Sequence, residues 1–533
     1  MLWWGGATAA LPHTTRNLPN QPSAGLKDNG LVASTLKPDP SRQINSTLYV
    51  TLQDAVNAAA GQRLKIFGIH TISTSVIINS NTEICFDGQA MILTSMPDIS
   101  FFYAKGKSHI SIRGGRFKQL CAGNKAYVAG VRLDNCIFCT VEDNVFEGMQ
   151  WSGIHFNGTT DSRISGNHIK TSLDSVAGDK FDIVLYHSHR NIINGNSCLG
   201  GQNGGILIQD PLGSGLDVPS HNKIVDNIVG SAAVPMNAYG IVLYLGGSRA
   251  TFHEILGNRV ENIKGDPLVQ LATGTGIYCV GSGIGGLIVR NNVVRNACQL
   301  TKQSTNGPAG ITIADVRSVE SRPVVANNVV DGMSQAHGIL LVSSSGGAVI
   351  ERNIVRIPAS NNGAGSGGIA LAGNGIRIFN TSNAIVSNNT VEHSGTSDAI
   401  LCLTTAGNCD KIEIIANTAF SAGGNAIRID RTDRYEQSNI KVIGNQLEAR
   451  SRGGLISIAG TDSVLISGNT GSANCGTALS LVDARRTRIS GNVLQTSATN
   501  SVTIRGRCEG SHFQRDNVIS GKIDNQATGM TLS

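Results

Sequence analysis

Apolar and polar residues alternate in short segments along most of the chain, and these segments recur at near-regular intervals. One segment in each interval leads to an Asn, with Val or Ile three residues before it in every interval but the last. Alternation with a period of two indicates β-strands rather than helices. The recurring residues, which are 23 to 36 residues apart, are Asn144, Asn167, Asn196, Asn227, Asn258, Asn292, Asn328, Asn353, Asn389, Asn417, Asn445, Asn469, Asn492 and Asn517.

A second strand in each interval has the form Gly-Ile-x-apolar, as in GIHF (153–156) and GILI (205–208), and a third short strand follows the Asn. The Asn falls at a bend, where its side-chain amide can hydrogen-bond to the equivalent Asn one interval away. Self-similarity of this kind predicts a solenoid. We expect an all-β fold: a parallel β-helix with three-strand coils about 4.8 Å apart and an internal asparagine ladder.

The two ends of the solenoid are expected to differ. The segment TLQDAVNAAAGQRL (51–64) has helical spacing of apolar residues and a Gly at position 61, which predicts an N-terminal capping helix at about 51–61. Residues 1–45, rich in Pro, Asn and Ser, predict an irregular arm, and residues 46–533 predict one β-helix domain. Because no further domain pattern follows Asn517, the C-terminal coils are expected to need cover from a partner or from additional sequence.

Composition argues against several classes of protein. The net charge of +6 comes without a Lys/Arg block, so we expect no nucleic-acid partner. No apolar run approaches the roughly 18 residues of a membrane span, and the first residues lack the pattern of a secretory signal. The eleven cysteines are scattered, and Cys136 and Cys139 are expected to face opposite sides of a strand. We therefore predict no metal site and no cofactor.

At the level of architecture, residues 45–520 resemble the right-handed parallel β-helix proteins of the pectin-lyase-like superfamily. The cap followed by LKIFGIHTISTSVIINSNTEICFDG (64–88) is especially similar to the start of bacterial and bacteriophage polysaccharide depolymerases, including tailspikes. The resemblance implies a polysaccharide substrate, an extracellular or virion-associated location and a homotrimer. The Asp-pair, Gly-His-Gly and Arg-Ile-Lys signatures of polygalacturonases and the Asp-Pro-His of mannuronan epimerases are absent, so no particular enzyme is indicated.

Loop lengths and strand alignment predict where a site would lie. Long connections at 170–181, 230–239, 261–275 and 295–309 are expected to wall a groove over residues 150–315. Alignment of the Gly-Ile strands places side chains of successive coils in three outward columns. The columns are His155, Val184, Leu207, Val242 and Tyr278; then Asn157, Tyr186, Gln209, Tyr244 and Val280; and, at the following turn, Gly158, His187, Asp210, Leu245 and Asp315.

His187 and Asp210 are the first catalytic candidates, because they occupy one column in adjacent coils. The Asp could orient the His as a general base, or act itself as acid or base. Asp182 and His155 are further catalytic candidates. The expected substrate-binding residues are the Tyr rings that can stack on sugars, with polar groups beside them: Tyr186, Gln209, Tyr244, Asn157, Lys180 and Tyr278.

Structural roles compete with each of these assignments. His187 in YHSHR and Asp210 before Pro211 also fit ordinary turns, and Asp182 and Lys180 fit an exposed charged loop. A second patch, IRIDRTDRYEQ (427–437), has the mixed signs typical of a salt-bridged surface, although its arginines could bind the carboxylates of an acidic glycan.

The sequence as a whole predicts a polysaccharide-binding and polysaccharide-cleaving protein that acts in an open lateral groove. Hydrolysis and β-elimination both remain open, and elimination requires a uronic acid and a cation beside its carboxylate. The alternative is a non-catalytic β-helix that binds glycans as an adhesin or as a structural tail component. No membrane partner is expected.

Overall fold

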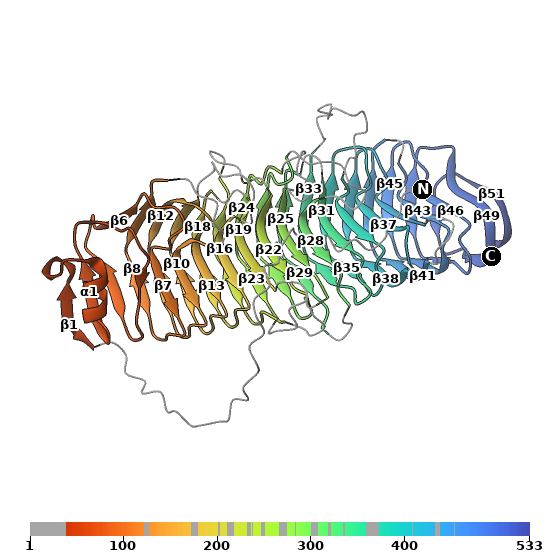
Figure 1. Cartoon of the computed structure of the whole chain (residues 1–533). Helices are drawn as coiled ribbons and strands as arrows, with labels where there is room; N and C mark the ends of the chain where they lie inside the picture. The colour runs from red at the N-terminus through yellow and green to blue at the C-terminus, as the bar shows by residue number, and fades with distance from the viewer. Residues whose placement is uncertain are drawn as a thin grey trace, which may run out of the picture.

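The chain winds into a long parallel β-helix that runs from α1 (Leu52–Ala58) at one end to β51 (Lys522–Leu532) at the other (Figure 1). Each strand pairs in parallel with the equivalent strand of the next coil. The computed structural model describes residues 39–121, 127–171, 180–200, 203–210, 218–231, 236, 238–246, 251–265, 274–282, 284–299, 308–317, 321–333, 336–358, 373–407, 409–431, 437–451 and 453–532.

Three stacks of strands, here called the first, second and third sheets, form the walls. The first sheet contains the Gly-Ile strands: β4 (Val76–Ile77), β7 (Phe102–Lys105), β10 (Ala129–Asp134), β13 (Ser152–Asn157), β16 (Phe181–Tyr186), β19 (Gly204–Gln209), β22 (Tyr239–Tyr244), β25 (Thr275–Val280), β28 (Ala309–Ala314), β31 (His337–Val342), β34 (Ile376–Phe379), β37 (Ile400–Thr404), β40 (Ile427–Arg431), β43 (Ile456–Ala459), β46 (Leu479–Val482) and part of β49 (Asn500–Phe513).

The second sheet contains the strands that precede the ladder residues. They are β1 (Asp39–Asn45), β2 (Gln62–Ile66), β5 (Glu83–Phe86), β8 (Ser111–Arg113), β11 (Thr140–Glu142), β14 (Arg163–Ser165), β17 (Ile192–Asn194), β20 (Lys223–Val225), β23 (Glu254–Leu256), β26 (Ile288–Arg290), β29 (Val324–Ala326), β32 (Val349–Glu351), β35 (Ile385–Ser387), β38 (Cys409–Ile415), β41 (Gln437–Ile443), β44 (Asp462–Ser467), β47 (Arg488–Ser490) and the end of β49.

The third sheet contains the strands that follow the ladder residues. They are β3 (Ile69–Thr71), β6 (Met91–Thr94), β9 (Arg116–Gln119), β12 (Val145–Met149), β15 (His168–Thr171), β18 (Ser197–Cys198), β21 (Ile228–Val229), β24 (Arg259–Glu261), β27 (Val293–Arg295), β30 (Val329–Asp331), β33 (Ile354–Ile357), β36 (Thr390–His393), β39 (Thr418–Ser421), β42 (Gln446–Ala449), β45 (Thr470–Ala473), β48 (Val493–Thr496) and β50 (Val518–Ile519).

The core is a continuous column of inward side chains contributed by all three sheets. In one coil, Ile154, Ile164 and Ile169 are each fully buried, and the alternation of apolar and polar residues accounts for this orientation. Gly153 opens its strand next to this core, and a Cβ atom there would lie 2.4 Å from Cγ2 of Ile169. The recurrent Gly of the first sheet therefore makes room for the third sheet.

The predicted asparagine ladder is present from Asn144 to Asn517. In each coil the side-chain Nδ2 donates to Oδ1 of the next ladder residue at 2.8–3.0 Å. Asn258 shows the full pattern, because its Nδ2 also donates to the carbonyl of Ile224 and its Oδ1 accepts from both N and Nδ2 of Asn227. Each buried amide thus has partners for its donors and acceptor.

A second, shorter ladder, which the sequence analysis did not predict, runs along the turn between the first and second sheets. The backbone N–H of Ser162 donates to Asn191, that of Asn191 to Asn222, and that of Asn222 to Nδ1 of His253 at 3.2 Å. The Nε2 of His253 lies 2.9 Å from the carbonyl of Pro219, so this nitrogen carries the proton. The neutral imidazole takes the place of a ladder amide.

The N-terminal end is capped as predicted. Thr51 is the N-cap of α1, accepting a hydrogen bond from the backbone N–H of Asp54, and the helix buries Leu52 and Val56. The expected boundary of the irregular arm at residue 45 is wrong, because Asp39–Asn45 forms β1 and pairs with β2. Residues 1–38 lie outside the described residues.

The opposite end shows apolar side chains at the last coil. Val518, Ile523 and Leu532 are 65%, 42% and 49% exposed. In the part of the chain that the structure describes, no helix covers β51. The expectation that a partner or additional sequence covers these coils therefore stays a prediction.

The expected orientation of Cys136 and Cys139 is wrong. Both thiols are buried inside the helix, because Phe138 between them adopts a left-handed conformation (φ 57°) and turns the chain. Each thiol donates to a backbone carbonyl, Cys136 to that of Asp134 and Cys139 to that of Ile137, and the neighbouring Cys136 together with burial raises the pKa of Cys139. All eleven cysteines are free.

We predict that Asn258→Ala lowers the free energy of unfolding by about 1–3 kcal/mol, because it leaves buried donors and acceptors of two neighbouring coils unsatisfied. Asn517→Ala, at the partly exposed end of the same ladder, is the matched control and should cost less. Urea denaturation followed by circular dichroism measures both. Equal, negligible losses would contradict the energetic role of the ladder.

We also predict that His253 makes the fold sensitive to acid. Burial lowers the pKa of His253 to about 4, so the stability that depends on the neutral ring is complete above pH 6.5 and is lost as the pH falls towards 4. This shift in the pKa of His253 corresponds to about 3 kcal/mol in the free energy of unfolding. The free energy of unfolding is measured by urea denaturation at pH 7.5 and at pH 4.5. The His253→Asn variant, whose amide can still accept from Asn222, should lack the part of the difference between the two values that comes from His253. An unchanged pH dependence would exclude His253 as its source.

Candidate functional site

The outward face of the first sheet carries the predicted columns in the predicted register. His155 pairs with Val184 and continues through Leu207 and Val242 to Tyr278, so these residues form one row across five coils. The second row, also in register, is Asn157, Tyr186, Gln209, Tyr244 and Val280. The strand pairing therefore holds side chains of successive coils at about 4.8 Å intervals.

A hydrophobic cluster outside the main core covers this face. Its members, here called the outer aromatic cluster, are Trp151, Phe181, Val184, Tyr186, Leu207 and Val242, with Tyr239, Tyr244 and Tyr278 packed against it. The rings of Tyr239 and Tyr278 stack, with their centroids 5.3 Å apart. Burial raises the pKa of Tyr244, and the Asp315 carboxylate adds to the shift, so its hydroxyl stays protonated near neutral pH.

His155 lies in a cage of aromatic rings at one end of the cluster. The ring centroids of Tyr127, Trp151 and Tyr186 are 5.8, 5.0 and 5.3 Å from that of His155. The imidazole is fully buried, and neither nitrogen has a hydrogen-bond partner. Burial, with a smaller effect from Arg132, lowers the pKa of His155 to about 3. In this conformation the ring is neutral and covered, so it could reach a substrate only if the cage opened.

His187 and Asp210 meet as predicted. The Nδ1 of His187 lies 3.6 Å from Oδ1 of Asp210, and their side chains are 24% and 6% exposed. A carboxylate at this side of the ring favours the tautomer with its proton on Nδ1, which leaves the lone pair on Nε2. His187 has a left-handed backbone (φ 46°), as do Gly158 and Asp315 at equivalent turns. The turn thus explains the backbone position of His187, and the Asp210 carboxylate lies beside its ring.

Asp182 lies on the inner side of its strand and not on the outward face. It replaces the recurrent Gly, is fully buried, and accepts a hydrogen bond from the backbone N–H of Gly200 at 3.2 Å. The third-sheet residue of this coil is Cys198, whose small side chain leaves space for the carboxylate where the two adjacent coils have Ile169 and Val229. Neither this placement nor the burial fits the exposed charged loop that was the alternative.

Lys180 precedes the same strand and is 2% exposed. Its Nζ has no hydrogen-bond partner, and burial lowers its pKa. Because β16 is six residues long, Lys180 lies about 20 Å along the strand from His187. The structure therefore does not bring the two together in one site.

The sequence analysis missed an ionic group beside the aromatic cage. Arg132 donates from Nε and Nη2 to the two carboxylate oxygens of Asp134 at 3.0 and 2.9 Å, and the Tyr103 hydroxyl donates to the same carboxylate. Arg132 also lies over the rings of Tyr103 and Tyr127. Arg132 and Asp134 precede His155 and Asn157 in their rows, so extending the alignment by one coil would have found them.

The competing patch at 427–437 is salt-bridged. Arg428 pairs with Asp430, and its side chain is 45% exposed. Asp433, Arg434 and Tyr435 lie outside the described residues, as do large parts of the expected groove walls, at 172–179, 232–235, 266–273 and 300–307. The walled groove accordingly remains a prediction.

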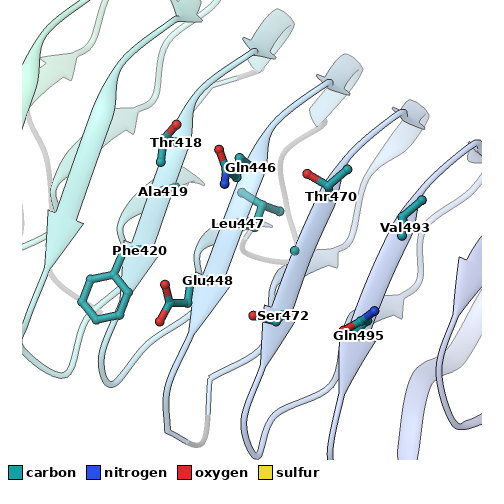
Figure 2. A pocket seen from close by; sticks show the side chains of 11 residues that line it. Thr418, Ala419, Phe420, Gln446, Leu447, Glu448, Thr470, Ser472, Val493 and Gln495 are labelled. Carbon is teal, nitrogen blue, oxygen red and sulfur yellow. The ribbon is translucent and has the colours of Figure 1, made fainter.

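A hollow of about 340 Å³ lies on the third sheet near the C-terminal end, over β39, β42, β45 and β48 (Figure 2). Two outward rows flank it: Thr418, Gln446, Thr470 and Val493, and Phe420, Glu448, Ser472 and Gln495. Its carboxylate, Glu448, pairs with exposed Arg450. The hollow is on a different wall from the outer aromatic cluster and contains none of the predicted site residues.

Among the described residues, no cluster of three or more His, Cys, Asp or Glu side chains is arranged to hold a metal ion. None of the described helices is long and apolar enough to cross a membrane.

Comparison with known proteins identifies the fold. The family model of the right-handed β-helix region matches residues 100–294, and no curated protein sequence matches significantly. A similar solved structure is a tailspike mutant of an E. coli bacteriophage with a hexasaccharide, which is 12% identical, with 93% of this chain and 77% of that chain covered and a TM-score of 0.38. A second is a Thermotoga maritima exopolygalacturonase, which is 10% identical, with 80% of this chain and 91% of that chain covered and a TM-score of 0.32. A third is a Streptococcus pneumoniae surface adhesin, which is 12% identical, with 92% of this chain and 94% of that chain covered and a TM-score of 0.32. At these identities and TM-scores, the similarities do not indicate an activity for this chain. Together with the parallel strand pairing, the family match shows a right-handed parallel β-helix, as predicted.

Proposed function

We propose that the protein binds a polysaccharide along the outer aromatic cluster and cleaves it beside His187 and Asp210. The observation that carries the proposal is the continuous outward row of Tyr186, Gln209 and Tyr244 on successive coils. Rows at a constant spacing suit a long ligand built of repeating units. Aromatic faces stack on the apolar faces of sugar rings, and Gln209 adds hydrogen-bonding groups between them.

The proposed chemistry is general-base catalysis by His187. Asp210 orients the ring and stabilises its protonated form, so Nε2 can take a proton from water or from a sugar carbon. Tyr244 stays protonated and can donate a hydrogen bond to a glycosidic oxygen. Tyr244 lies on the same face two coils from Tyr186, which precedes His187, because Tyr186 pairs with Gln209 and Gln209 pairs with Tyr244.

Two routes of bond cleavage use this base. In hydrolysis it activates a water, and in β-elimination it removes a proton beside the carboxylate of a uronic acid. Asp210 and Asp315 occupy equivalent turns three coils apart, which is about 14 Å. Paired carboxylates of inverting glycosidases are about 6.5–9.5 Å apart, so these two do not form such a pair. Asp210 and Asp315 therefore do not act together in two-carboxylate hydrolysis of the inverting type.

The rival proposal is a glycan-binding protein without catalysis. It is supported by the left-handed turn that His187 shares with Gly158 and Asp315, since the turn alone accounts for the position of the residue. In either case we propose an extracellular or virion-associated location, where large polysaccharides occur, and a homotrimer whose subunits cover the exposed C-terminal coils.

Incubation with a panel of bacterial and plant polysaccharides tests the proposal. We expect at least one polymer to be shortened, measured by reducing ends and by the ultraviolet absorbance of unsaturated products. Reducing ends without absorbance identify a hydrolase, and both signals identify a lyase. Binding without either signal across the panel would support the rival.

Matched variants test the residues. Asp210→Asn keeps the shape of the side chain but removes its charge, so cleavage should fall by at least about 100-fold while binding changes little. Tyr186→Ala and Tyr244→Ala remove stacking surface and should weaken binding by about 1 kcal/mol or more each. Arg428→Ala lies outside the proposed site and should be nearly silent. Full activity of Asp210→Asn together with an inactive Arg428→Ala would move the site to the C-terminal half.

A further inference from the structure

A buried arginine without a carboxylate partner lies further along the same outward face. Arg377 in β34 continues the row of Tyr278 through Thr312 and Leu340, and is 9% exposed. Its Nη1 lies 3.0 Å from Nε2 of His337, whereas its Nε has no hydrogen-bond partner. Arg377 forms no ion pair with any Asp or Glu of the described residues. A buried guanidinium without a counter-ion is costly to a fold.

The contact with His337 does not compensate for this cost. The Nδ1 of His337 faces the backbone N–H of Asn374 at 2.8 Å, and its Nε2 faces the Arg377 guanidinium. A neutral imidazole has only one lone pair to offer, so two donors face a ring that can accept from one of them. Burial and the Arg377 charge lower the pKa of His337, which keeps the ring neutral. The cluster therefore has a surplus of donors and lacks an acceptor.

The sequence next to Arg377 supplies no carboxylate as that acceptor. The segment 359–372, which leads into β34, contains neither Asp nor Glu. Asp398, just before the adjoining strand β37, is already engaged, because Oδ1 accepts from N and Nδ2 of Asn425 and Oδ2 lies 4.0 Å from Arg428. A carboxylate partner for Arg377 is consequently expected from outside the chain.

The guanidinium is held in an orientation that suits a carboxylate. Its Cζ lies 4.7 Å from the centre of the Phe379 ring, so the plane of the group is supported from one side. Because Nη1 faces His337, the edge of the guanidinium that is left for a carboxylate is the one formed by Nε and Nη2. Arg132 uses this same edge to bind Asp134 at 3.0 and 2.9 Å, which shows the geometry that a bound carboxylate would adopt.

We propose that Arg377 anchors a subsite for the carboxylate of an acidic sugar. This inference rests on the proposed function and narrows its substrate class to glycans that contain uronic acid. Arg377 lies five coils from Gln209 and the adjoining Asp210, which is about 24 Å along the helix. It therefore binds a sugar unit several residues away from the cleaved bond and takes no part in the chemistry.

Binding of three uronates tests the subsite in the full chain. Sodium D-glucuronate, D-galacturonate and D-mannuronate are titrated calorimetrically at pH 7 and low salt, beside glucose, galactose, mannose and sodium sulfate. We expect at least one uronate to bind 10-fold or more tightly than its neutral parent sugar and than sulfate. Arg377→Gln should abolish the preference, and Arg377→Lys, which keeps the charge but loses the fork, should retain part of it.

Arg428→Gln is the matched control, because Arg428 lies in the same row, two coils further on, but is exposed and paired with Asp430. It should change uronate affinity less than twofold. The thermal midpoint of ligand-free Arg377→Gln should equal or exceed that of the wild type, since the variant removes an unpaired buried cation. A fall of several degrees would identify a structural arginine and overturn the proposal. No preference for any uronate, or a preference that survives Arg377→Gln, would also overturn it.

The results separate this inference from the proposed function. Loss of the uronate preference in Arg377→Gln, with no polysaccharide cleaved, supports the subsite and rejects the depolymerase. Cleavage of a neutral polysaccharide by a protein without uronate preference supports the depolymerase and rejects the subsite.

Discussion

A side-chain amide buried away from water has to find partners for all its donors and acceptors, and this requirement recurs once in nearly every coil. Asn258 meets it only when the coils on both sides lie in one register, because its partners are Asn227, Ile224 and Asn292. A slip of one residue would turn the inward side chains outward and leave these amides unsatisfied. The ladder thus fixes the register of the outward rows, which in turn aligns Tyr186, Gln209 and Tyr244.

The repeating part of the structure was predictable because every coil meets the same packing demand. The ladder, the three strands and the capping helix were all visible as spacing, and the contact between His187 and Asp210 followed from register alone. Single coils that depart from the repeat were not predictable. Asp182 goes inward because its opposite residue is Cys198, and the Cys136–Cys139 pair depends on a left-handed residue between them. Such exceptions depend on partners far apart in the sequence.

The outward face of the first sheet changes in character along the helix axis. It begins with the Arg132–Asp134 pair and the aromatic cage, continues through the outer aromatic cluster, becomes apolar around Leu340, and ends with the charged residues Arg377 and Arg428. His155 and Arg377 on this face each have a buried polar atom without a hydrogen-bond partner. Unsatisfied groups of this kind are costly to keep in a fold.

The ladder bonds stay at 2.8–3.0 Å although the coils they join range from 23 to 36 residues in length. The extra residues fall mainly between the third and first sheets: two separate β12 from β13, and thirteen separate β24 from β25. Insertions and deletions at this corner leave the core contacts in place, so selection on folding scarcely restricts them. Descendants of such a chain can exchange the loops that border the outward face of the first sheet in single mutational steps, without rebuilding the scaffold.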